Sequence, residues 1–156
     1  MAERIVYDKA KYHYDGDFPA DLEMEQGFVH TGMFLGWIID HDLYSEWFGM
    51  ELSAYVVAFK ARDITGAKVF EACDGVLIDE MLTDEGNQFA QHYFDFERGK
   101  YLGDYGELLG KGLPTMYHVA DTWPNYEKLK QRIDKRYREW KNSKSGGWRS
   151  FFKKLR

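Results

Sequence analysis

The apolar run from residue 28 to residue 39, FVHTGMFLGWII, limits the possible folds more than any other segment. Apolar residues recur there at helical spacing and cover more than one stripe of the helix: Met24, Phe28, Leu35 and Ile38, widened by Met33, Phe34 and Trp37. Asp21 is positioned to cap this helix, which we expect to run to about His41. Because an apolar helix must be covered on most sides, the rest of the chain has to surround it.

Gly32 and Gly36 lie four residues apart within this segment. A glycine inside a helix costs about 1 kcal/mol relative to alanine. The expected compensation is the close approach of another helix or of an aromatic ring. The two glycines therefore predict a tight helix crossing.

Caps and periodicity predict further helices along the chain. Ser45, Thr83 and Thr122 are the expected caps of three of them. The expected helical segments are 45–62, about 67–73, from 83 onward, 101–109 and from 122 to about 140. Residues 116–119 have some β character but no evident partner strand. A chain of 156 residues with this pattern predicts a mostly α protein, a single compact helical domain of about five or six helices with at most a minor β element.

Charge is distributed unevenly along the chain. Residues 127–156 contain 12 Lys and Arg against 3 Asp and Glu, whereas residues 1–126 contain 9 against 23. The stretch NSKSGG, which begins at Asn142, is expected to end the last helix. We therefore expect a helical domain over residues 1–142, followed by a basic amphipathic tail over residues 143–156. The acidic body would repel a phosphate backbone, so no nucleic-acid partner is expected.

Cys73 is the single cysteine, which excludes an intramolecular disulfide and leaves no sign of an oxidising compartment. The longest apolar stretch is far shorter than the roughly 20 residues that cross a bilayer. The N-terminal residues lack the apolar core of a signal peptide. These features predict a cytoplasmic protein without stable membrane insertion.

His30 is a polar residue inside the apolar helix, and buried polar groups normally find partners. We expect it to be a structural residue, bonded to a backbone carbonyl or to Asp15 or Asp17. In the alternative, His13 and His30 would join these two aspartates in a metal or catalytic site. His41 lies about 16 Å further along the helix axis, too far to share a metal ion with His30.

An acidic cluster follows the cysteine, and we interpret it as a solvated face or a docking patch for a protein partner. Its possible partner-binding residues are Asp74, Asp79, Glu80, Asp84 and Glu85, with Tyr101 and Tyr105 as aromatic anchors. The spacing of the acids fails the EF-hand pattern, and no phosphate-binding, nucleotide-binding or hydrolase motif is present. The sequence assigns no catalytic residue, no cofactor and no metal ligand.

Several segments recur in an order that resembles a family of small bacterial proteins. They are YDKAKYHYDGDFP, HTGMFLGW, ITGAKVFEACDGVL, DEGNQFAQHYFDF and MYHVADTWPNYEKLKQRIDKRYREW, and they span about residues 7 to 140. The resemblance extends to immunity-type proteins of bacterial toxin systems. It implies an acidic single-domain protein that neutralises a cognate toxin.

Three functions are therefore open at this point. The first is a cytoplasmic immunity-type protein that blocks a basic toxin domain by stoichiometric docking. The second is a small metal-dependent or His/Asp-based enzyme that uses His13 or His30 with Asp15 and Asp17. The third is a housekeeping interaction module.

Overall fold

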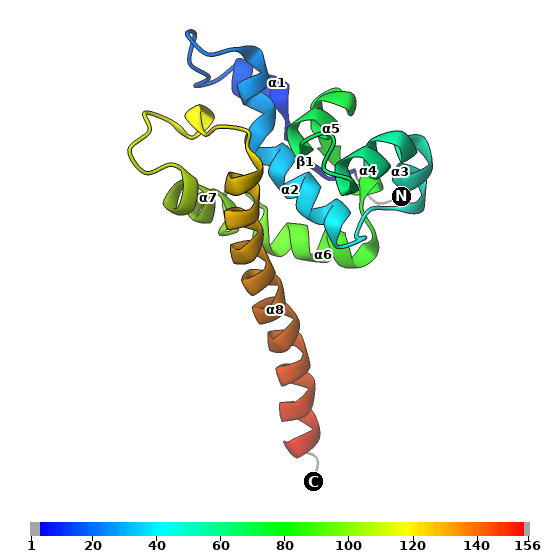
Figure 1. Ribbon diagram of the computed structural model, residues 1–156. Helices are drawn as coiled ribbons and strands as arrows, with labels where there is room; N and C mark the ends of the chain where they lie inside the picture. Colours follow the sequence, from blue (N-terminus) through cyan, green and yellow to red (C-terminus); the bar gives the residue numbers. More distant parts are fainter. Residues whose placement is uncertain (1–3, 155–156) are drawn as a thin grey trace.

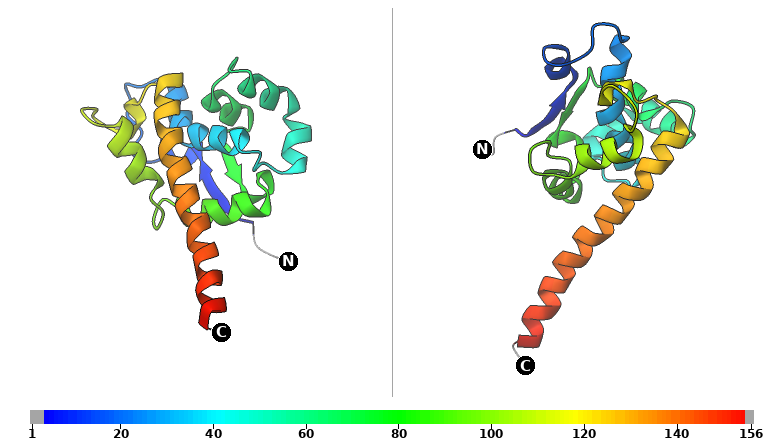
Figure 2. Two further views of the ribbon diagram at one scale, coloured as in Figure 1. Left: turned by 60° about the horizontal axis from the view of Figure 1, so that its bottom comes forward. Right: turned by 90° about the vertical axis from the view of Figure 1, so that its left-hand side faces the viewer.

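The computed structural model describes the backbone of residues 4–154 and the side chains of residues 4–144. Within these residues the expected mostly helical single domain with a minor β element is confirmed (Figures 1 and 2). In chain order its elements are β1 (Val6–Lys9), α1 (Ala10–Tyr14), the 3₁₀ helix η1 (Met24–Phe28), α2 (Val29–Asp40), α3 (Glu46–Glu51), α4 (Ser53–Lys60), α5 (Gly66–Ala72), β2 (Val76–Ile78), η2 (Asp79–Met81), α6 (Asp84–Tyr93), α7 (Tyr101–Leu109), η3 (Met116–His118) and α8 (Trp123–Lys154).

The central helix is α2, and every residue from Val29 to Ile39 is buried. Figure 1 shows it running through the middle of the body, with other helices around it. The α-helix was expected to begin just after Asp21, but it begins at Val29. The residues before it form the 3₁₀ helix η1, so Asp21 does not cap α2. The predicted burial over most of the circumference is confirmed.

The predicted tight crossing lies between α2 and α5. A Cβ atom built on Gly32 would lie 2.5 Å from the Cα of Ala67, and one built on Gly36 would lie 2.7 Å from a ring carbon of Phe59. Both distances are far below a normal contact: at Gly32 the two backbones themselves touch, and at Gly36 the ring of Phe59 packs directly on the helix backbone. The glycines are therefore required by the close approach of α5 and α4 to α2.

Three predicted caps are present as hydrogen bonds. The Ser45 and Thr83 hydroxyls accept from the backbone N–H groups of Phe48 and Gly86, and the Thr122 hydroxyl accepts from Asn125. The helix expected over 45–62 is interrupted at Leu52, which leaves the helical region (φ −109°, ψ 26°) and separates α3 from α4. This interruption is one reason why the structure has more helices than expected.

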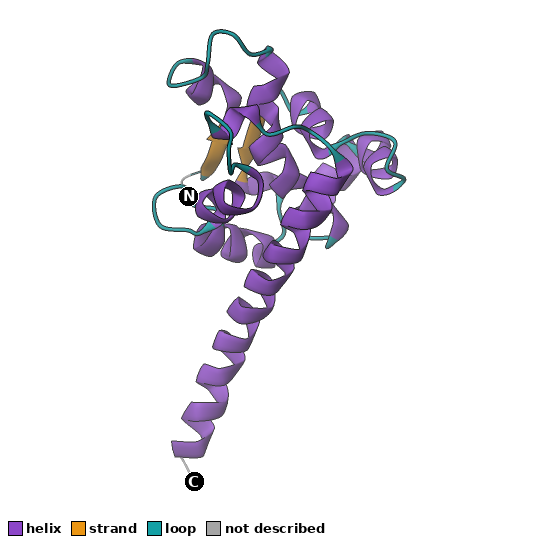
Figure 3. Ribbon diagram, turned by 60° about the vertical axis from the view of Figure 1, so that its left-hand side comes forward, coloured by secondary structure: helices purple, strands orange, loops and turns teal. Residues whose placement is uncertain are grey.

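The small sheet pairs β1 with β2 in antiparallel register, and the sequence did not predict it. Figure 3 shows the two strands as the sheet element of a helical body. The register shifts between Val6 and Asp8, so the strand is irregular just where Asp8 enters the interior. Residues 116–118, where β character was expected, form the 3₁₀ helix η3.

The last helix, α8, continues to Lys154 without the break expected at Asn142, so the predicted boundary between a helical domain and a separate tail does not coincide with the end of this helix. Its first half packs on the body, whereas Figures 1 to 3 show the second half projecting beyond it. In the part of the chain that the structure describes, no helix is both long and apolar enough to cross a membrane.

Candidate metal centre

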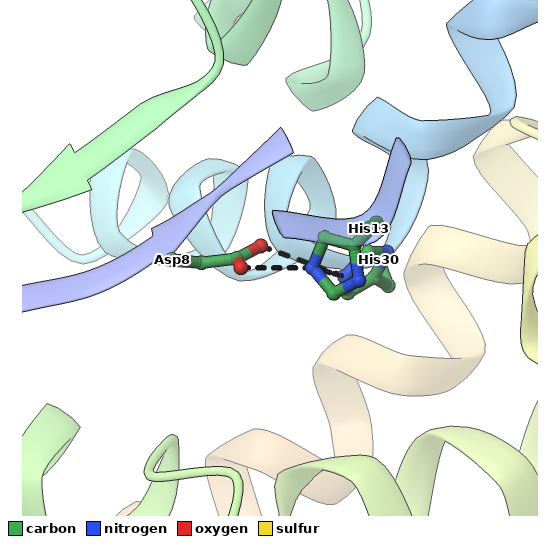
Figure 4. A group of neighbouring side chains, drawn as sticks. All are labelled: Asp8, His13 and His30. Atoms are coloured by element: carbon green, nitrogen blue, oxygen red, sulfur yellow. Dashed lines mark hydrogen bonds and ion pairs between the residues drawn. The ribbon is translucent and has the colours of Figure 1, made fainter. Parts of the chain in front are cut away.

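Three side chains with metal-binding atoms lie close together where the N-terminal elements meet the central helix α2. Asp8 comes from β1, His13 from α1 and His30 from α2 (Figure 4). Each offers one ligand atom, and these atoms all lie within 4.8 Å of one another. The cluster is buried: the side chains of Asp8 and His30 are each 1% exposed, and that of His13 is 10% exposed.

The contacts inside the cluster are short. His13 Nε2 lies 2.8 Å from Asp8 Oδ1, and His30 Nε2 lies 3.5 Å from Asp8 Oδ2. The two Nε2 atoms lie 3.1 Å apart. Ligand atoms on a tetrahedral ion with bonds of about 2.0–2.1 Å are separated by about 3.3 Å. The 3.1 Å between the two Nε2 atoms is close to this value, whereas the two carboxylate distances run to different oxygens of Asp8.

Neighbouring side chains fix the orientation of the carboxylate and of one imidazole. The Thr31 hydroxyl donates to Asp8 Oδ2 at 2.6 Å. His13 Nδ1 contacts the Tyr117 hydroxyl at 2.6 Å, and Gln26 holds η3 in place by donating to the carbonyl of Tyr117. Such outer contacts orient metal-binding side chains, and they set which imidazole nitrogen keeps its proton.

The surroundings shift the pKa values of two members of the cluster, His30 and Asp8. Burial lowers the pKa of His30, and the neighbouring Asp8 carboxylate offsets this only in part. Burial alone would raise the pKa of Asp8, but hydrogen bonds from His13 and His30 bring it well below its ordinary value. An ionised Asp8 and a neutral His30 are forms that bind metal ions, and a bound ion would take the place of the protons through which the imidazole Nε2 atoms contact Asp8.

Hydrogen bonding does not account for the cluster completely. Two Nε2 atoms at 3.1 Å make a hydrogen bond only if one is protonated and the other is not, and His13 Nε2 also faces Asp8. Meanwhile His30 Nδ1 is buried and, among the described residues, has no hydrogen-bond partner. A cation at the point where the two Nε2 atoms and the carboxylate meet would satisfy these three groups at once, whereas His30 Nδ1 would stay without a described partner.

The structure corrects the predicted partners of His30. The prediction that His30 is buried is confirmed, and His13 does meet it. Asp15 and Asp17 are exposed and take no part in the cluster. Their place is taken by Asp8, which the sequence did not single out, because its position depends on the pairing of β1 with β2.

The predicted partner-binding residues are only partly at the surface. Tyr101 and Tyr105 are fully buried, so they cannot be aromatic anchors. Their rings belong to the core, and the Tyr101 hydroxyl donates to the backbone carbonyl of His30.

The acids of the predicted docking patch differ in exposure and in pairing. Asp74, Glu80 and Asp84 are exposed, and Glu80 pairs with Arg4, whereas the half-buried Glu85 pairs with Lys141. Asp79 is half-buried and accepts from the backbone N–H of Glu80. Part of this patch is therefore already neutralised by the protein's own cations.

The comparisons with known proteins give one finding. A family model described as "Domain of unknown function (DUF7832)" matches residues 6–119. This range contains all three residues of the cluster and ends before α8. Neither a curated protein nor a solved structure matches the chain.

Proposed function

The chain belongs to the DUF7832 family, and we propose that it is a metal-binding protein that holds one divalent transition-metal ion through Asp8, His13 and His30. The observation that carries this proposal is the 3.1 Å approach of two imidazole Nε2 atoms beside an ionised carboxylate. Like atoms with lone pairs are brought together in this way when a cation lies between them.

The donor set favours a divalent transition-metal ion, of which zinc is the one used in the test below. Two imidazoles and one carboxylate suit zinc, cobalt, nickel and iron better than magnesium or calcium, which prefer oxygen ligands. Three protein ligands leave a tetrahedral ion with one position for a non-protein ligand. Because the cluster joins β1, α1 and α2, the ion would also fasten the N-terminal segment to the central helix.

Metal analysis of the purified protein tests the proposal. We expect one zinc per chain after incubation with zinc and removal of the excess, and a visible tetrahedral spectrum after replacement by cobalt. Zinc should also raise the melting temperature, since a ligand that binds only the folded state stabilises it. The variants His13→Gln and His30→Gln should lose the bound metal.

His41→Gln is a matched control. His41 Nε2 lies 2.9 Å from Asp134 Oδ1, so this residue is also a histidine beside an aspartate, but no second imidazole joins it. Full metal content in His41→Gln with none in His30→Gln supports the site. Equal metal content in both variants, or no binding by the unaltered chain, contradicts it.

An immunity-type binding function is the second candidate, and the exposed acids Asp74 and Asp84 favour it. An acidic face complements the basic cleft of a toxin domain and speeds encounter. The test is the kinetics of binding to the product of the adjacent gene at low and high salt. Changing both residues to Lys should slow association, whereas an absence of binding would exclude this function.

A further inference from the structure

Large apolar side chains are concentrated at the surface of α3 and α4. Trp47, Met50, Tyr55 and Val57 are all exposed, and Met50 and Val57 reach 71% and 68% exposure. Single exposed apolar residues are ordinary, but Trp47 also lines a hollow in the surface, and an exposed apolar hollow marks an interaction surface. None of these residues belongs to the metal centre.

Next to these residues the surface is hollowed into a cavity of about 280 Å³, which we call the α3–α5 groove. Apolar side chains from α3, α5, β2 and η2 line most of it, among them Trp47, Leu52, Ala72, Val76, Ile78 and Met81. Its two charged lining residues, Glu51 and Asp74, are both acidic and both exposed. The groove therefore fits an apolar segment that carries positive charge.

The same chain carries a segment of this kind at its other end. Residues 141–156 contain six Lys and Arg and no Asp or Glu, and Trp148, Phe151 and Phe152 recur there at helical spacing. Figure 1 shows the end of α8, which includes residues 141–154, projecting away from the body that holds α3 and α4. A basic amphipathic helix projecting from one molecule is thus available to the groove of another.

We propose that the α3–α5 groove binds residues 141–156 of a second copy of this chain, so that the protein self-associates. The segment matches the groove in composition, because its aromatic residues suit the apolar lining and its cations suit the acidic Glu51 and Asp74. This mode is the insertion of an amphipathic helix into a hydrophobic groove. A contact between two different surfaces closes into a dimer when it is reciprocal and otherwise continues from copy to copy.

Light scattering coupled to size exclusion tests the self-association of the full chain. We expect the mass to rise above that of one chain as concentration increases from low micromolar upward. Trp47→Ser and Asp74→Lys should each weaken the association by about tenfold or more, as for central residues of an interface. Leu113→Ser is the matched control, because Leu113 is also an exposed apolar residue but lies outside the groove.

A labelled peptide of residues 141–156 identifies the segment that the groove accepts. Fluorescence anisotropy should show that it binds the full chain, that Trp47→Ser weakens this binding, and that a scrambled peptide of the same composition does not bind. A chain that stays monomeric throughout, or equal binding of the two peptides, overturns the proposal. Binding of the peptide to anionic vesicles with no binding to the chain would also overturn it. None of these variants alters a metal ligand, so metal content is expected to stay unchanged in all of them.

Discussion

At the scale of single residues, the interior contains polar groups that differ in how completely they are bonded. The Tyr93 hydroxyl donates to Asp104 at 2.8 Å, whereas the buried Tyr105 hydroxyl has no partner among the described residues. Around the metal centre, Thr31 and Tyr117 are bonded to Asp8 and His13. The effect of removing a hydroxyl should therefore depend on its partner rather than on its burial.

The Thr31 hydroxyl should matter for metal binding although it is not a ligand. Thr31→Val keeps the shape of this fully buried residue but removes the hydrogen bond that orients the Asp8 carboxylate. We expect zinc affinity to fall by about tenfold or more, as for other residues that hold a metal ligand in place. Competition with a chromophoric chelator measures it. Thr31→Ser keeps the hydroxyl and should keep the affinity, and an unchanged affinity in Thr31→Val would contradict this role.

The two buried tyrosines on α6 and α7 give a paired prediction. Tyr93→Phe leaves Asp104 with one donor fewer and should cost about 1–3 kcal/mol of unfolding free energy. Tyr105→Phe removes a buried hydroxyl that has no described partner, so it should be neutral or stabilising. Urea unfolding of both variants is the measurement. A larger loss in Tyr105→Phe than in Tyr93→Phe would show that the Tyr105 hydroxyl has a partner after all.

The sequence predicted individual residues well where the interaction is local. Ser45 and Thr83 cap helices that begin at the next residue, and the partner of each cap lies three positions further on. The partner of His30 could not be predicted in the same way. Asp8 reaches it only because β1 pairs with a strand far along the chain, and strand pairing leaves little signal in two such short segments.

At the scale of elements, the crossing of α2 and α5 determines how the core is built. Gly32 and Gly66 face each other so closely that a Cβ atom on Gly66 would lie 2.1 Å from the carbonyl oxygen of Gly32. Backbone atoms cannot move aside as a flexible side chain can. The geometry therefore tolerates no side chain at this point.

Gly32→Ala should be strongly destabilising, since its new methyl group would meet the backbone of Ala67. We expect a loss of about 3 kcal/mol or more, at or beyond the upper end of typical overpacking costs. Gly103→Ala is the matched control, because Gly103 lies in α7 with no atom within 4 Å of its built Cβ. That variant should gain up to about 1 kcal/mol from helix propensity. Thermal unfolding compares the two, and similar melting temperatures would contradict the crossing.

The limits of the helices were harder to predict than their existence. Leu52 interrupts the helix expected over residues 45–62, although neither glycine nor proline marks the break. Conversely, the two glycines at 146 and 147 do not end α8. Local propensity decides such points only weakly, and the packing of neighbouring elements can outweigh it.

At the scale of the whole molecule, the start of the basic C-terminal segment is held against the acidic body by ion pairs. Ion pairs fasten α8 to the body at two buried or half-buried carboxylates, Asp40 and Asp104. Asp40 contacts Arg62 and Lys130, and Asp104 contacts Arg132 and Arg136. Cations of the basic segment are thus partly neutralised by carboxylates of the acidic body. The sequence predicted the charge asymmetry but could not predict which residues would pair.

The pH dependence of stability should follow from these two carboxylates. Burial alone would raise the pKa of Asp104 and of Asp40, but hydrogen bonds from Arg136 and Tyr93, and from Arg62 and Tyr126, lower the pKa of each below its ordinary value. A carboxyl whose pKa is lower in the folded state stabilises the fold at pH values above its unfolded pKa of about 3.9. That contribution is lost as the pH falls through the folded pKa, so the protein should lose stability in acid.

Asp104→Asn should remove part of this acid sensitivity. At neutral pH the variant leaves Arg132 and Arg136 without their shared carboxylate, and we expect a loss of about 3 kcal/mol, the lower end for breaking a buried pair. The difference from the unaltered chain should shrink as the pH falls from the unfolded pKa of about 3.9 toward the lower folded pKa, at which Asp104 becomes protonated in the folded unaltered chain as well. Urea unfolding across this pH range measures the difference, and Asp17→Asn, which changes an exposed aspartate, is the control. A difference that stayed constant with pH would mean that Asp104 stabilises the fold by shape and neutral hydrogen bonds rather than by its charge.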